Sequence, residues 1–172
     1  AMPDSLNDLP PVPKNNEKIS KGEAIAGIVF SVIFAVVLLA APQIIAVTFG
    51  DGKFVTVFAE EIIKNTWYII IALTIIGIAK ESMKLIEGRY SRRLLIATVI
   101  ANLLTAVLSI YWLVDNQIIN PDFITGINGL IIGDAGFIRY VFVNCQYFIL
   151  GVILLALILN TVTTALRTIK SK

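Results

Sequence analysis

The chain has 172 residues, of which 57% are hydrophobic and 15% are charged, against about 45–50% and 25% in typical soluble domains. A soluble fold would leave much of this apolar surface in water, so the composition favours an integral membrane protein. The sequence has no histidine and a single cysteine, Cys145. These counts exclude a disulfide within the chain and the usual zinc sites, and they remove the commonest general base near neutral pH.

Residues 1–19 are predicted to form a cytoplasmic linker. They are rich in proline, asparagine and charged residues and show no apolar periodicity, which is typical of an extended segment. We interpret Ala1 and Met2 as a cloning scar. A start inside a linker also suggests that a further segment precedes residue 3 in the native protein.

The first membrane span is predicted over residues 24–41. Ser20 and Glu23 match the capping box that begins a helix. The apolar run after them would be about 27 Å long as a helix, close to a bilayer core of about 30 Å. Pro42 either kinks this helix or begins an interfacial continuation through Phe49.

The second span is predicted over residues 64–82. It follows an amphipathic segment, Phe54–Lys64, which is expected to lie along the outer membrane interface. Trp67 suits the aromatic belt of a membrane protein. The strictly apolar stretch after it is short, about 20 Å. Lys64 and Lys80 are therefore expected to extend to opposite headgroup layers.

The third span is predicted over residues 94–114, with Ser91 as its N-cap, and the fourth over residues 137–166. Between them, an Asn-Pro dipeptide is a good helix start. It predicts a short interfacial helix over Pro121–Ile132, followed by a break at residues 133–136.

These elements predict an all-α membrane protein: a four-transmembrane-helix bundle over residues 20–172, with short interfacial helices on the outer side. An even number of spans places both termini on one side. The basic residues are divided eleven to three between the two sides, and by the positive-inside rule the richer side is cytoplasmic. We therefore expect a multi-pass protein of a bacterial cell membrane with cytoplasmic N- and C-termini.

The sequence shows no catalytic constellation, no phosphate-binding loop and no spacing typical of metal ligands. We therefore expect neither enzymatic activity nor a cofactor or metal. The formal net charge of +2 indicates no nucleic-acid partner, and the expected partner is the lipid bilayer.

Polar side chains inside the predicted third and fourth spans are candidate ligand-binding residues: Asn102, Thr105, Asn144 and Gln146. Polar groups in hydrocarbon need partners, so one interpretation is structural, with hydrogen bonds to neighbouring helices. The other is a polar cavity for a ligand or ion. No ionisable residue is placed clearly at the centre of a predicted span, which disfavours a proton- or ion-coupled transporter.

The predicted cytoplasmic loop between the second and third spans is strongly basic: Lys84, Arg89, Arg92 and Arg93. One interpretation is a topology signal combined with attraction to anionic lipid. The other is a docking surface for a cytoplasmic domain or partner. The sequence does not choose between them.

Four stretches carry a family resemblance: DLPPVPKNNEKISKGEAIAGIVFSVIF, GDGKFVTVFAEEII, KLIEGRYSRRLLIATVIANLL and NPDFIT. They are similar to the membrane portion of Firmicute-type proteins with a HAAS signalling domain, which tend to be encoded beside PadR-like transcription regulators. The resemblance implies a helical cytoplasmic module, a linker and several transmembrane helices, with no catalytic residues. The HAAS module itself is absent from this sequence.

The sequence leaves three functions open. The leading hypothesis is a membrane-embedded sensory or regulatory domain, whose outer segments respond to an envelope or lipid-phase signal and whose inner loop and tails act on an upstream signalling domain or regulator. The alternatives are a small transporter or permease subunit, and a structural assembly partner in a membrane complex. Self-association into a homo-oligomer is compatible with all three.

Overall fold

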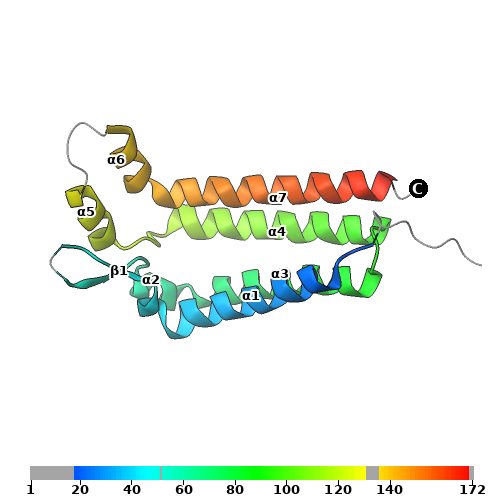
Figure 1. The fold of residues 1–172 in the computed structure, drawn as a ribbon, viewed down its shortest axis with the longest axis horizontal. Coiled ribbons are helices and arrows are strands. Elements are labelled where there is room, and N and C mark those ends of the chain that lie inside the picture. Colours follow the sequence, from blue (N-terminus) through cyan, green and yellow to red (C-terminus); the bar gives the residue numbers. More distant parts are fainter. Residues whose placement is uncertain (1–17, 51, 131–135, 171–172) are drawn as a thin grey trace, which may run out of the picture.

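The computed structural model describes residues 18–50, 52–130 and 136–170. Four long helices run side by side along its length (Figure 1). They are α1 (Lys21–Ala40), α3 (Trp67–Glu87), α4 (Arg92–Asp115) and α7 (Cys145–Lys170). One end of the bundle carries the short elements and is called the strand end. The other, where α3 turns into α4 and α7 ends, is called the terminal end.

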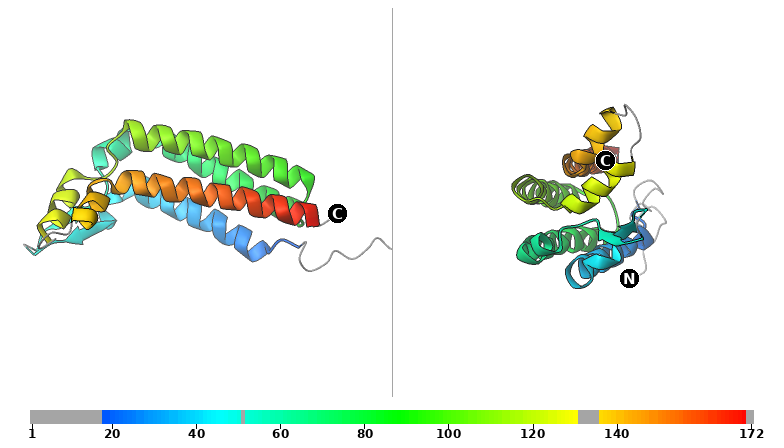
Figure 2. Two further views of the ribbon diagram at one scale, coloured as in Figure 1. Left: turned by 90° about the horizontal axis from the view of Figure 1, so that it is seen from above. Right: turned by 90° about the vertical axis from the view of Figure 1, so that its left-hand side faces the viewer.

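The long helices pack in chain order rather than as a closed ring. α1 packs against α3, α3 against α4, and α4 against α7. Seen end on, α1 and α3 form one layer and α4 and α7 the other (Figure 2). Contacts between α1 and α7 are few at most within the described residues. α3 and α4 therefore join the two layers.

Local capping signals set the helix ends as the sequence predicts. The Ser20 hydroxyl accepts a hydrogen bond from the Glu23 N–H at 3.3 Å, and the Ser91 hydroxyl accepts one from the Leu94 N–H at 3.1 Å. Both satisfy N–H groups that the first turn of a helix leaves free. α3 ends at Gly88, whose φ of 63° is left-handed and suits glycine.

The predicted amphipathic segment at the strand end is different in the structure. The chain makes a 3₁₀ turn over Pro42–Ile44 and then a two-stranded antiparallel hairpin of β1 (Ala46–Thr48) and β2 (Phe54–Thr56). Only then does the short helix α2 (Glu60–Asn65) begin. The physical reason is a glycine turn between β-branched runs, a hairpin signal that outweighs the helical periodicity.

The predicted fourth span is also wrong as one continuous helix. It is divided into α6 (Gly136–Val143) and α7, and α6 turns away from the α7 axis (Figure 1). At the junction, the Asn144 carboxamide donates to the Tyr140 carbonyl at 2.9 Å. Such a side chain competes with the helical backbone for partners.

The short helix α5 (Pro121–Leu130) begins where the sequence predicts. The Asn120 side-chain oxygen accepts a hydrogen bond from the Asp122 N–H at 3.0 Å, and Pro121 is the first helical residue. The predicted break at residues 133–136 and the predicted linker lie mostly outside the described residues. Within them, the Ile19 N–H donates to the Gly88 carbonyl at 3.1 Å.

Three helices, α1, α4 and α7, are long and apolar enough to cross a membrane. Their outer faces are exposed and apolar, as at Phe30, which is 70% exposed, and such faces suit lipid rather than water. α3 has the required length, but Lys80, Glu81 and Lys84 lie in its second half.

Candidate functional site

The Asn102 side chain is the centre of a polar cluster midway along α4. Its amide nitrogen donates to the Leu157 carbonyl at 3.3 Å, to Asn160 Oδ1 at 3.0 Å and to Thr161 Oγ1 at 2.8 Å. These three acceptors all belong to α7. Asn102 is only 4% exposed, so its partners replace the water that a buried amide would otherwise lose.

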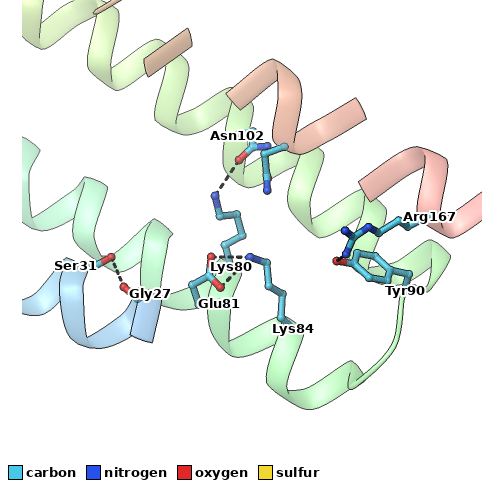
Figure 3. Close-up of polar contacts among 9 residues, drawn as sticks. Gly27, Ser31, Lys80, Glu81, Lys84, Tyr90, Asn102 and Arg167 are labelled. Carbon is cyan, nitrogen blue, oxygen red and sulfur yellow. Dashed lines mark hydrogen bonds and ion pairs between the residues drawn. The ribbon is translucent and has the colours of Figure 1, made fainter. Parts of the chain in front are cut away.

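Lys80 of α3 joins this cluster from the opposite layer (Figure 3). Its ammonium donates to Asn102 Oδ1 at 3.2 Å. The expectation that Lys80 extends to a headgroup layer is therefore wrong: its ammonium lies against the middle of α4. The reason is that α3 packs against α4, so the nearest strong acceptor is the Asn102 amide. An ionisable group held between long apolar helices is a strong pointer to a functional site.

Glu81, the residue after Lys80, forms an ion pair with Lys84 one turn further along α3, with an Nζ–Oε1 distance of 2.8 Å (Figure 3). The Glu81 side chain lies over Gly27 of α1, where an added β-carbon would come within 3.1 Å of its Cγ. Gly77 similarly faces Ser31 of α1. Small residues at these positions let α1 and α3 approach closely, as at many helix contacts within membranes.

Thr98 is the one buried side chain near this cluster whose polar atom lacks a partner among the described residues. It lies one turn before Asn102 on the same face of α4 and is 1% exposed. An unpaired hydroxyl in such a place carries a free-energy cost of about 1–3 kcal/mol.

The strand-end half of the bundle combines an apolar core with polar contacts. A core of buried residues from both layers gathers there: Ala35, Ile63, Ile70, Leu113, Ile118 and Leu150. The Trp112 Nε1–H of α4 also donates to the Thr66 hydroxyl at the start of α3, at 2.8 Å. Apolar packing and a hydrogen bond therefore hold the two layers together at this end.

Gln146 belongs to the strand end rather than to the Asn102 cluster. Its carboxamide oxygen accepts from the Ile118 N–H at 2.9 Å, and its nitrogen donates to the Leu113 and Asn116 carbonyls. Gln146 is 9% exposed. Its side chain pairs with backbone groups at the C-terminal end of α4 and in the chain after it that would otherwise lack hydrogen-bond partners. This is a structural role.

The other two predicted ligand-binding residues have local partners. The Thr105 hydroxyl donates to the Ala101 carbonyl of its own helix at 2.8 Å, and the Asn144 amide bonds Tyr140 at the α6–α7 junction. The structure therefore separates the four candidates, and only Asn102 lies at a contact among three long helices.

The predicted basic docking residues lie at the terminal end but differ in exposure. Arg89, Arg92 and Arg93 are exposed, whereas Lys84 is half-buried in its pair with Glu81. Beside them, Arg167 of α7 donates to the Tyr90 hydroxyl at 2.8 Å, and its guanidinium lies 5.2 Å from the Tyr90 ring centre (Figure 3). This contact connects the α3–α4 loop to the end of α7.

Sequence reasoning missed Lys80, Asn160 and Thr161 as partners of Asn102. Asn160 and Thr161 are visible as polar residues in an apolar helix, but nothing in the sequence aligns them with residue 102. The residues that the structure describes contain no group of three or more Cys, Asp or Glu side chains suited to a metal ion. The cluster can hydrogen-bond a polar or anionic group.

Comparisons with known proteins give no further guide. No family model, no curated protein and no solved structure matches this chain.

Proposed function

We propose that this chain is the membrane-embedded sensory or regulatory domain of a bacterial cell-membrane protein. In this proposal the strand end faces outward, both termini lie in the cytoplasm, and a change at the strand end reaches cytoplasmic partners through the bundle. The HAAS resemblance agrees with such a role, and the basic residues of the terminal end agree with the orientation.

The proposal treats α3 as a fourth membrane span. α3 lies along α1 on one side and α4 on the other, so a bilayer that holds its neighbours would also surround α3. Its charged residues have partners that ease burial: Glu81 pairs with Lys84, and Lys80 bonds Asn102. Charges within membranes are tolerated when they face the bundle and pair in this way.

The observation that carries the proposal is the joining of the two outer segments. The Ala59 N–H donates to the Ile118 carbonyl at 2.8 Å, and the Asn120 N–H donates to the Val57 carbonyl at 3.0 Å. The Asn120 side chain adds a bond to the Thr56 carbonyl at 3.0 Å. A ligand or stress acting on either segment would therefore move both layers.

The terminal end has matching connections. Residue 19, where the N-terminal segment enters, bonds Gly88 of the α3–α4 loop, and Tyr90 of that loop holds Arg167 of α7. The Asn102 cluster lies between the two ends and links both layers. A relay needs elements with alternative packings, and a limited set of polar bonds is easier to rearrange than a continuous apolar core.

Hydrogen–deuterium exchange of the full chain in lipid nanodiscs tests the relay. Asn120→Ala removes bonds at the strand end, and we expect faster exchange at residues 88–90 as well as locally. Thr125→Ala is the matched control, because within the described part of the chain the Thr125 hydroxyl bonds just the Pro121 carbonyl of its own helix. Changes confined to the strand end in the Asn120 variant would refute the relay.

A small transporter is the second candidate, and Lys80 is the observation that favours it. A cation that bonds a buried amide between apolar helices is typical of substrate or ion pathways. This function predicts solute flux in proteoliposomes that Asn102→Leu abolishes. Absence of flux for a broad solute panel would leave the regulatory proposal as the better account.

A further inference from the structure

A groove of about 290 Å³ runs between α3 and α4 beside the Asn102 cluster. Alanines on both helices make room for it: Ala79 on α3, and Ala97 and Ala101 on α4. Ile100 and Leu104 form its apolar wall and are about half exposed. Lys80 also lines the groove, between Ala79 and Met83 of α3, so an otherwise apolar groove carries one cationic side chain.

The charges around Lys80 leave an uncompensated positive charge. A lysine ammonium has three donors, and Asn102 Oδ1 is the one hydrogen-bond acceptor of Lys80 within the described part of the chain. The neighbouring carboxylate of Glu81 is already paired with Lys84. An anionic group at Lys80 would add a charge-assisted hydrogen bond in a region of low dielectric.

We propose that this groove binds a long-chain fatty acid, with its carboxylate at Lys80 and its hydrocarbon chain along the alanine-lined channel between α3 and α4. The ligand class follows from charge complementarity at Lys80 and apolar lining along the rest of the groove. The biological role of this binding rests on the proposed function, because the fatty acid would be the lipid-phase signal that the relay reports.

The volume and the depth of the groove favour one chain over a two-chain phospholipid. Its volume lies at the low end of ligand pockets, which hold about 300–1,000 Å³. Lys80 is eight residues before Gly88, or about 12 Å from the end of α3. A phospholipid would have to draw its glycerol and headgroup into the bundle to reach that depth, whereas a fatty acid brings only a carboxylate.

Photolabelling of the full chain in phosphatidylcholine nanodiscs tests the site. The probe is palmitate with a diazirine midway along its chain, and labelled peptides are identified by mass spectrometry. We expect label on residues 75–83 and 97–104, displaced by excess palmitate. Lys80→Met should lower the labelling about tenfold, the loss of one charge-assisted contact. Ala101→Leu, which fills the groove and keeps Lys80, should lower it similarly.

Two control variants should label normally. Ala156→Leu makes the same change at an exposed position of α7, and Lys64→Met removes an exposed lysine of α2. Lys80→Arg, which keeps the charge, should retain most of the labelling if Lys80→Met proves unstable.

Several results would overturn the site. One is labelling that spreads evenly over the lipid-facing helices. Another is labelling that Ala101→Leu does not lower. The third is displacement of the probe by methyl palmitate or phosphatidylglycerol as efficiently as by palmitate. Because the experiment measures binding directly, a relay that fails the exchange test leaves the binding result standing. Loss of binding likewise leaves the exchange result standing.

Discussion

The Lys80 ammonium lies 3.2 Å from Asn102 Oδ1, so a charged hydrogen bond joins α3 to the middle of α4. The same carboxamide bonds Asn160 and Thr161 of α7. Three of the four long helices therefore meet at one side chain, which adds to the apolar packing between the two layers.

Replacing Asn102 by leucine should destabilise the bundle by about 2 kcal/mol. The change removes interhelical hydrogen bonds worth about 0.6 kcal/mol each and leaves the Lys80 ammonium without its acceptor. The free energy of unfolding in mixed micelles checks this value. In the double variant with Lys80→Met, the total loss should be smaller than the sum of the single losses. Additive losses would mean that the two side chains do not interact.

Replacing Thr98 by valine should leave the stability unchanged or raise it slightly. Valine has the same shape as threonine and removes a buried hydroxyl that lacks a partner. Thr161→Val is the matched comparison, because the Thr161 hydroxyl accepts from Asn102 at 2.8 Å. It should cost about 1 kcal/mol. Melting temperatures in detergent should be lower for the Thr161→Val variant than for the Thr98→Val variant. Equal losses of stability in the two variants would contradict the prediction.

Gln146→Leu should weaken the strand end by about 2 kcal/mol, because it leaves buried N–H and carbonyl groups of residues 113–119 unpaired. Hydrogen exchange should rise in that segment. Asn144→Leu is the control: among the described residues its side-chain amide bonds the Tyr140 carbonyl alone, and the exchange of residues 113–119 should not change.

Two glycines of α5 should respond oppositely to alanine. A β-carbon on Gly126 would come closer than 3.0 Å to the Phe49 ring, whereas one on Gly129 would meet nothing within 4 Å. Gly129→Ala should stabilise the helix by up to about 1 kcal/mol. Gly126→Ala should force Phe49 aside at a cost of about 1–3 kcal/mol. Thermal unfolding followed by tryptophan fluorescence separates the two results, and a stabilised Gly126 variant would contradict the packing of Phe49.

The sequence predicts those features that depend on neighbouring residues. Ser20, Ser91 and Asn120 cap helices through hydrogen bonds that span two or three residues. The long apolar helices are also predictable, because a bilayer of fixed thickness requires an apolar segment of a fixed minimum length.

Features that depend on distant contacts are not predictable in this way. The β-hairpin competes with a helical pattern over the same residues, and the joining of Val57 to Asn120 stabilises it across 63 positions of the chain. At Asn144 the side chain competes locally with the helical backbone, and α6 also packs on α5, a contact that the sequence does not predict. The Lys80 contact depends on the alignment of α3 against α4, which apolar periodicity alone does not define.

The central claim is a four-span arrangement that places the α3–α4 loop and the strand end on opposite sides of the membrane. Its most direct test uses a Cys145→Ser background with single cysteines at Glu61 or Arg89, which lie before and after α3, treated in intact cells with a membrane-impermeant maleimide. Both positions are exposed in the structure. We predict that Glu61→Cys reacts at once, whereas Arg89→Cys reacts only after the membrane is permeabilised. If both positions reacted at once, or neither did before permeabilisation, α3 would not cross the bilayer, and the account would be contradicted.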